Sequence, residues 1–364
     1  MPERKAILAT AGAGKTTEVI QRALGATGGR VVLLTFTAEN QRRLDTHLRA
    51  AAGALPPQIR VMGWFSFLIN ECIKPYQAAL TGVPFAVRGL NFTGEAPRYA
   101  RNESVERYLD GNLDVYRDRV AQCAVHLNTL TNGLVARRLE RCHSHVFLDE
   151  VQDCAGYDME VLDLLFGTSI NVVVVGDPRQ AIITTNHGPL NKKYRGHGLW
   201  DWVKERSSLI ALEERNTNYR CHAEICTLAN SVFPVLPAAT SGLATSSGHD
   251  GVFFVSNKDL EWYLATYPPD IALRQTKATE THDLPAMNIG VAKGDTFNRV
   301  LVFPTKPMRD FLLSRDPGPL RSPEHLYVAV TRARYSVTFV VPEDECSAYT
   351  SAGPGTWARP EDAA

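Results

Sequence analysis

The sequence lacks several features that define particular classes of protein. Its 39 Lys+Arg residues are balanced by 39 Asp+Glu residues, so no overall positive charge draws it to nucleic acid. No apolar run approaches the roughly 18 residues that a membrane-spanning helix requires, and no signal peptide opens the chain. The seven cysteines form no CxxC pair, which argues against a zinc ribbon or a disulfide framework. We therefore expect a cytoplasmic protein with no membrane partner, whose cysteines are reduced.

A stretch of small residues at positions 9–17 (ATAGAGKTT) ends in Gly-Lys-Thr and directly follows a short apolar run. Small residues let backbone N–H groups wrap a phosphate chain. The lysine can then reach the β- and γ-phosphates, and the next hydroxyl can ligate Mg²⁺. A strict Gly-x4-Gly-Lys-Ser/Thr pattern fails at Ala9, but the strand–loop–helix context favours a nucleotide site. The predicted nucleotide-binding residues in this loop are Ala11, Gly12, Ala13, Gly14, Lys15, Thr16 and Thr17.

Continuous apolar runs of strand length occur in two groups along the chain. They lie at residues 31–34, 146–148 and 172–175, and at residues 252–255, 300–303 and 337–341. Such runs are typical of buried parallel strands that helices cover on both faces. The fold class that we expect is therefore α/β, with two parallel-sheet domains.

The expected domain boundaries follow from these two groups and from a polar stretch between them. They are a first domain over residues 1–74 and 141–205, a small and mainly helical insertion over 75–140, a second domain over 206–350, and a mobile tail over 351–364.

Acidic and amide side chains follow two of the apolar runs. In residues 149–153 (DEVQD), Asp149 can hold Mg²⁺ and Glu150 can polarise a water for attack on a γ-phosphate. In residues 176–180 (GDPRQ), Gln180 can sense a phosphate or a water through its amide. Each pattern is also compatible with a plain turn after a strand. Because the carboxyl ends of strands bind ligands in open α/β sheets, and a phosphate loop precedes both motifs, we favour the catalytic interpretation.

The phosphate loop, DEVQD and GDPRQ, in this order, resemble the UvrD/Rep-type helicases of superfamily 1. The resemblance continues at residues 212–220 (LEERNTNYR) with Ala229-Asn230, at 292–297 (AKGDTF), and at 326–334 (LYVAVTRAR). It implies two RecA-like P-loop domains, with ATP and Mg²⁺ bound at the cleft between them. The implied activity is ATP hydrolysis by a DNA helicase of 3′→5′ polarity. The implied partner is single-stranded DNA, or a duplex with a single-stranded tail.

The resemblance also implies roles for residues of the second half. Arg220 and Arg332 correspond to arginines that stabilise charge at the γ-phosphate, which makes them predicted catalytic residues beside Glu150 and Gln180. Tyr219 matches the residue that stacks on the nucleotide base, and Gly294 belongs to the matched nucleotide-binding motif at 292–297. The predicted metal ligands are Thr16 and Asp149.

Contacts with DNA are expected from the first domain. Thr35 and Phe36 belong to a Thr-Phe-Thr sequence that resembles a DNA-contacting motif of these helicases, and Trp64 and Phe65 lie in a similar aromatic segment. An exposed aromatic ring could stack on a base. Aromatic residues after a strand are also common in protein cores.

The sequence departs from the helicase pattern in ways that leave other functions open. The upstream glutamine motif that reads adenine is missing, and only about seventy residues separate the motifs at 212–220 and 292–297, where larger relatives insert a whole domain. One alternative is a non-unwinding NTPase switch that regulates a partner such as a nuclease in DNA repair or phage defence. RNA in place of DNA stays open, whereas a small-molecule kinase is disfavoured because it would not need the second set of arginine motifs.

Overall fold

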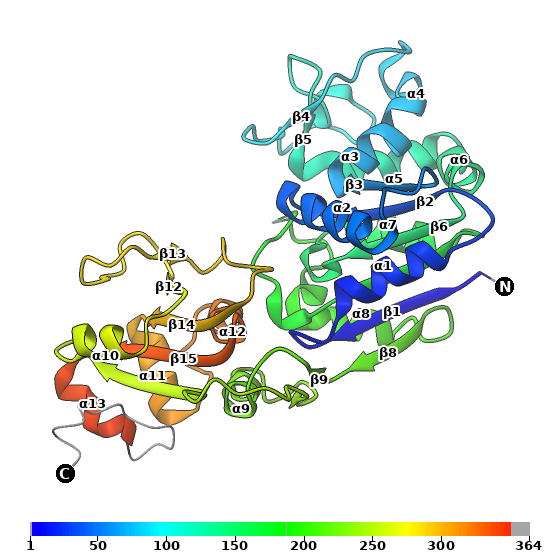
Figure 1. Ribbon diagram of the computed structural model, residues 1–364. Coiled ribbons are helices and arrows are strands. Elements are labelled where there is room, and N and C mark those ends of the chain that lie inside the picture. The colour runs from blue at the N-terminus through cyan, green and yellow to red at the C-terminus, as the bar shows by residue number, and fades with distance from the viewer. Residues whose placement is uncertain (1, 187, 351–364) are drawn as a thin grey trace. The chain divides into compact units, whose positions relative to one another are not determined.

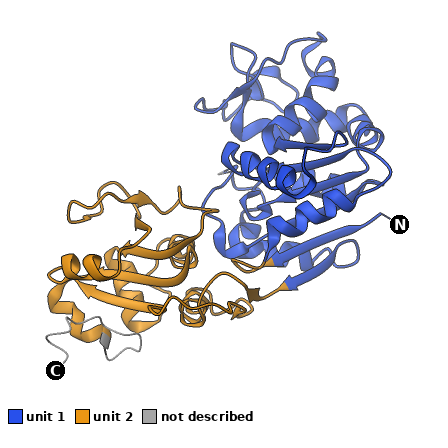
Figure 2. Ribbon diagram, viewed as in Figure 1, with its two compact units in different colours: residues 1–8, 14–214 blue, residues 9–13, 215–364 orange. Residues whose placement is uncertain are grey.

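The computed structural model describes residues 2–186 and 188–350, and its internal contacts divide the chain into two units (Figure 2). Unit 1 comprises residues 1–8 and 14–214. Unit 2 comprises residues 9–13 and 215–364. Residues 9–13 of the phosphate loop thus contact unit 2 more extensively than unit 1.

Unit 1 is built around a sheet whose strands include the first group of apolar runs (Figure 1). Within its described residues this sheet has six strands in the order β3-β2-β6-β7-β1-β8, and the pairs among the first five are parallel. The strands are β1 (Arg4–Ala9), β2 (Val31–Thr35), β3 (Ile59–Gly63), β6 (His145–Asp149), β7 (Asn171–Gly176) and β8 (Ala211–Arg215). β2, β6 and β7 are buried over nearly their whole length, which explains their unbroken apolar sequences.

In unit 1, helix α2 begins and ends at residues with recognisable capping roles. Thr37 accepts a hydrogen bond from the N–H of Asn40 at the start of α2, and Gly53 ends that helix with a left-handed φ of 76°. The helices outside the insertion are α1 (Lys15–Gly25), α2 (Ala38–Ala52), α3 (Trp64–Phe67), α7 (Tyr157–Phe166) and α8 (Leu199–Lys204), and a π-helical turn, η1 (Leu68–Ile73), continues α3. The three-residue turns η5 (Val151–Asp153) and η6 (Pro178–Gln180) follow β6 and β7.

The expected insertion at residues 75–140 belongs to unit 1. It carries α4 (Ala78–Thr81), α5 (Val120–Leu130) and most of α6 (Leu134–Cys142). A small sheet of β4 (Leu90–Asn91) and β5 (Val115–Tyr116) lies between α4 and α5 in the chain. α5 packs against α7 and η1, which fixes the helical part of the insertion to the body of unit 1.

Unit 2 contains a second parallel sheet that includes the second group of apolar runs. In the described part of this unit it has five strands, β11-β15-β14-β12-β13. They are β11 (Gly251–Ser256), β12 (Ile271–Arg274), β13 (Met287–Asn288), β14 (Phe297–Phe303) and β15 (Ala333–Val341). A minor sheet pairs β9 (Thr217–Asn218) with β10 (Thr240–Ser241). The helices are α9 (Ala223–Val232), α10 (Leu260–Thr266), α11 (Lys306–Ser314), α12 (Pro323–Thr331) and α13 (Glu343–Thr350).

The expected α/β class with two parallel sheets is confirmed. The structure places the boundary between the units after Glu214, whereas the sequence predicts it after residue 205. The difference arises because β8 is an edge strand with exposed and half-buried residues, and therefore lacks the apolar run that identifies a buried strand. The predicted mobile tail lies outside the described residues. No helix of the described chain is both long and apolar enough to cross a membrane.

Candidate nucleotide site

The phosphate loop leads directly into a helix whose N-terminus is free of a side-chain cap. Gly14 precedes α1 with a left-handed φ of 78°, and this N-cap residue makes no side-chain capping hydrogen bond. Gly12 is also left-handed, with φ of 68°. Glycine adopts this conformation without steric cost, and an uncapped helix N-terminus is favourable for a phosphate group. The local backbone therefore fits the predicted nucleotide.

The two predicted metal ligands lie beside each other in unit 1. The hydroxyl of Thr16 donates a hydrogen bond to Asp149 Oδ2 at 3.2 Å, joining the start of α1 to the end of β6. Burial and the neighbouring Glu150 carboxylate raise the pKa of Asp149 to about 7, although Lys15 opposes this shift. A buried carboxylate with an adjacent hydroxyl suits a hard cation that takes its other ligands from phosphate and water.

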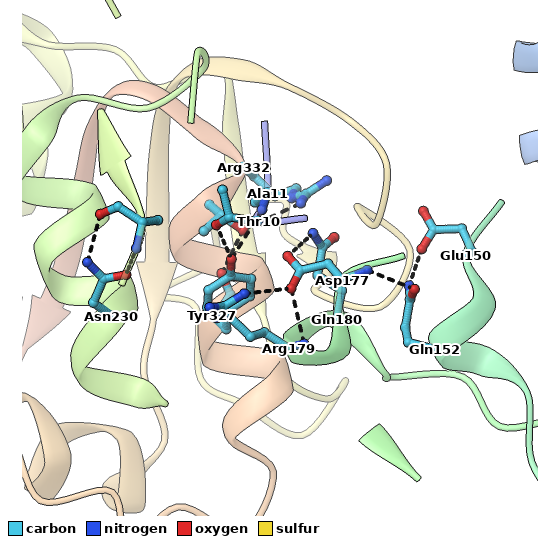
Figure 3. Close-up of polar contacts among 12 residues, drawn as sticks. Thr10, Ala11, Glu150, Gln152, Asp177, Arg179, Gln180, Asn230, Tyr327 and Arg332 are labelled. Carbon is cyan, nitrogen blue, oxygen red and sulfur yellow. Dashed lines mark hydrogen bonds and ion pairs between the residues drawn. The ribbon is translucent and has the colours of Figure 1, made fainter. Parts of the chain in front are cut away.

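Glu150 has a strained backbone, and its side chain is held by Gln152. Its φ of 63° is left-handed, which is uncommon for a residue with a side chain and carries a cost in backbone energy. The Gln152 amide donates to the Glu150 carboxylate, and Gln152 Oε1 accepts a hydrogen bond from the N–H of Asp177 at 3.0 Å (Figure 3). A side chain at Gly176 would collide with Gln152 Oε1. Gln152 therefore connects the DEVQD and GDPRQ motifs, a role that the sequence analysis missed.

Asp177 organises the second motif. It is fully buried, and its carboxylate accepts hydrogen bonds from Gln180 Nε2 at 2.8 Å and from Arg179 Nη1 at 3.2 Å (Figure 3). Burial alone would raise the pKa of Asp177, but the charges of Lys15 and Arg179 and the hydrogen bonds hold it below its ordinary value. Gln180, predicted as catalytic, is thus oriented by Asp177. Arg179 was also missed, and its position inside GDPRQ was the available signal.

In unit 2 the two predicted catalytic arginines lie at one end of α12. Arg220 donates from Nη1 to the carbonyl of Thr331 at 3.1 Å. Arg332, which follows Thr331 in the sequence, is 1% exposed. It donates hydrogen bonds to the carbonyls of Val328 and Asp295 at 3.2 and 3.1 Å. These carbonyls fix the direction of the Arg332 guanidinium.

The other predicted nucleotide-binding residues of unit 2 differ in their surroundings. Tyr219 is 64% exposed, which leaves its ring accessible for stacking, and its N–H donates to the Gly12 carbonyl at 3.0 Å. Gly294 is exposed and left-handed, with φ of 93°. The Ala11 N–H donates to the hydroxyl of Tyr327 at 3.2 Å, so this loop amide is bound to a side chain of α12 (Figure 3).

Two of the four predicted DNA contacts are buried in the core. Trp64 is fully buried, and its indole N–H donates to Asp158 Oδ1 at 2.7 Å. Thr35 is fully buried in β2. Their assignment as nucleic-acid contacts is therefore wrong for this structure. Phe36 and Phe65 are half-buried and keep accessible surface.

The remaining aromatic candidates contact other rings. The Phe36 ring lies 6.1 Å from that of Trp64, and Phe65 makes an edge-to-face contact with Phe92 of the insertion at 6.2 Å between centroids. Because Phe92 is 61% exposed, the pair of Phe65 and Phe92 presents an aromatic edge to solvent. This surface joins the segment after β3 to the insertion.

Parallel sheets, a glycine-bearing phosphate loop and an acidic pair after another strand of the same sheet are the features of a P-loop protein. The family model described as "Viral superfamily 1 RNA helicase core domain" matches residues 115–341. Because this match spans more than half of the chain, the protein belongs to that family, whose members hydrolyse nucleotides. The expected superfamily 1 helicase is confirmed, whereas the UvrD/Rep subgroup stays a prediction.

The solved structures that resemble the chain include two of arterivirus nonstructural protein 10, a helicase. One, of the protein alone, has 16% sequence identity and a TM-score of 0.48, and covers 96% of this chain and 61% of its own. The other, a complex with DNA, has 18% identity and a TM-score of 0.48, and covers 94% of this chain and 62% of its own. This chain thus spans about three fifths of the length of either structure. Among curated proteins, none is similar enough to count as a match.

Proposed function

We propose that the protein is an ATP-dependent translocase or helicase of the UvrD/Rep type, acting on single-stranded DNA or on a duplex with a single-stranded tail. The observation that carries its NTPase part is the contact of Thr16 with Asp149, next to Glu150. These residues bring together a cation-binding pair and a general base at the carboxyl edge of one parallel sheet. The motor part rests on the helicase family and on the motifs of unit 2.

The proposed roles of the predicted site residues account for the successive needs of hydrolysis. Lys15 neutralises charge on the β- and γ-phosphates. Mg²⁺, held by Thr16 and Asp149, would neutralise further phosphate charge when bound. Glu150 accepts the proton of the attacking water, and the hydrogen bond from Gln152 fixes the direction of its carboxylate. Arg220 and Arg332 stabilise the charge that develops on the transferred phosphoryl group.

RNA is the second candidate substrate, and the family match favours it. The exposed edge of Phe65 and Phe92 can stack on a base of either nucleic acid, because every base presents a π-face. This aromatic surface therefore serves either substrate.

ATPase rates measured alone and with single-stranded DNA, duplex DNA or RNA test the proposal. We expect single-stranded DNA to stimulate hydrolysis and strand displacement to accompany it on a tailed duplex. Stimulation by RNA alone would transfer the proposal to RNA. Turnover that no nucleic acid changes would contradict a motor and indicate an NTPase switch that regulates a partner such as a nuclease.

Two variants test the site assignment itself. Lys15→Ala and Glu150→Gln should each abolish hydrolysis, because they remove a phosphate contact and the general base. Lys277→Ala and Glu106→Gln change the same residue types at exposed positions and are the matched controls, expected to hydrolyse at the normal rate. Full activity in either site variant would show that hydrolysis does not use this site.

A further inference from the structure

A cavity of about 320 Å³ lies at the amino edge of the sheet of unit 1, the edge opposite the phosphate loop. Arg30 immediately precedes β2, Arg60 is the second residue of β3, and His143 lies shortly before β6. The cavity is therefore lined by residues at the starts of three neighbouring parallel strands. The strands are five residues long, which separates the two edges by about 17 Å at roughly 3.3 Å per residue. The cavity is therefore distinct from the candidate nucleotide site.

The walls of this cavity, which we call the amino-edge pocket, carry an excess of positive charge. Arg30, Arg60 and Arg138 line it together with a single carboxylate, Glu71. Arg138 pairs closely with Glu71 at 2.7 Å, whereas the Arg60 guanidinium is 3.7 Å from that carboxylate and its side chain is 66% exposed. Two of the three guanidinium charges thus have no full counter-charge in the pocket wall.

His143 completes the wall and is the second sign of a binding site. It is 9% exposed, and neither ring nitrogen has a hydrogen-bond partner within the described residues. Burial, followed by the charges of Arg138, Arg30 and Arg60, lowers its pKa, although the Glu71 carboxylate 3.9 Å from Nε2 opposes this shift. Buried polar groups normally have partners, so the ring nitrogens of His143 at this cavity are available to a bound group.

We propose that the amino-edge pocket binds a small free phosphorylated molecule. Guanidinium groups match the geometry of phosphate oxygens and remain charged at any working pH. The volume lies at the lower end of the range for small-molecule sites, which suits a phosphate ester or a diphosphate group rather than a long chain. Arg30 and Arg60 contact the phosphate, and Glu71 holds Arg138 at the base of the pocket.

Pyrophosphate binding to the full-length Lys15→Ala protein tests this proposal, because that substitution disables the phosphate loop. Titration calorimetry should give a Kd of about 1 mM or tighter. The Arg30→Ala/Arg60→Ala double variant should weaken binding by about tenfold or more, since each change removes a charge-assisted contact. The ring signals of His143, assigned with His143→Gln, should shift on pyrophosphate addition in nuclear magnetic resonance spectra.

Arg42→Ala/Arg49→Ala is the matched control, because these arginines are also exposed and lie on α2 of the same unit. Equal loss in both double variants, or no pyrophosphate binding at all, would overturn the proposal. The proposal would also be overturned if pyrophosphate does not bind and the Arg30→Ala/Arg60→Ala variant loses affinity for a single-stranded oligonucleotide. The bound anion would then be the backbone of a nucleic acid. If the double variant does not fold, Arg60→Gln alone gives the same comparison. None of these outcomes depends on ATP hydrolysis, so this experiment tests the amino-edge pocket independently of the proposed motor function.

Discussion

Trp64→Phe distinguishes a core tryptophan from one that stacks on nucleic acid. The substitution keeps an aromatic ring but removes the N–H that donates to Asp158 Oδ1 at 2.7 Å. Asp158 is 1% exposed and also accepts hydrogen bonds from Thr185 and from the N–H of Ala155, so Trp64 supplies part of the solvation of a buried carboxylate. Leaving a buried acceptor without its donor costs about 1–3 kcal/mol, and the smaller ring adds roughly 1 kcal/mol for the cavity. We therefore expect a loss of about 2–4 kcal/mol in the free energy of unfolding.

Urea denaturation followed by circular dichroism measures this loss, and fluorescence anisotropy with a labelled single strand measures affinity under folding conditions. Trp64→Phe should lower stability and leave the affinity of the folded protein unchanged. Phe65→Ala is the comparison: its half-buried ring should contribute little to stability but about 1–3 kcal/mol to single-strand binding. A Trp64→Phe protein of normal stability and weakened single-strand binding would refute the assignment of Trp64 to the core.

Three further predictions concern the site and unit 2. Gln152→Ala should lower kcat by about tenfold or more with little change in KM for ATP, because it frees the Glu150 carboxylate without changing the phosphate loop. Steady-state kinetics measure both constants, and a change in KM alone would contradict this prediction. Arg332→Ala should slow turnover far more than it weakens ATP binding, as measured by single-turnover hydrolysis beside equilibrium binding, whereas equal losses would exclude a transition-state role. Burial, reinforced by Arg299, lowers the pKa of His249 to about 4. Its neutral form therefore stabilises the fold above pH 6.5, and this contribution, at most about 3 kcal/mol, is lost as the pH falls from 6.5 to 4. His249→Phe should flatten that part of the unfolding profile, and an unchanged profile would show that another group causes it.

The sequence predicts the strands and the acidic motifs well because both depend on local pattern. Buried parallel strands need continuous apolar residues, and DEVQD and GDPRQ are recognisable where they follow such runs. The edge strand β8 has no such pattern, because all of its residues are exposed or half-buried. Its pairing with the sheet depends on residues that are distant in the sequence. The observed domain boundary therefore differs from the predicted one.

The fate of the aromatic residues depends on tertiary contacts that no local pattern contains. Trp64 and Phe65 are neighbours in one short helix, yet one is fully buried and the other half-buried. The difference in burial is associated with Asp158 in α7, which is distant in the sequence and whose carboxylate accepts a hydrogen bond from the indole N–H. A buried carboxylate requires donors, so the pair of Trp64 and Asp158 is explained once α3 and α7 are known to be adjacent.

The same reasoning explains why the polar motifs cooperate although they are separate in sequence. Gln152 binds the Glu150 carboxylate with its amide nitrogen and the Asp177 N–H with its oxygen, so a change at the end of β7 reaches the Glu150 carboxylate through one side chain. Gly176 leaves the space that this amide occupies, and a β-carbon there would displace it. The glycine of GDPRQ therefore serves the geometry of DEVQD. A Gly176→Ala protein should bind ATP but hydrolyse it slowly, in the same way as Gln152→Ala. Weak ATP binding with a normal kcat in this variant would show that the two motifs act independently.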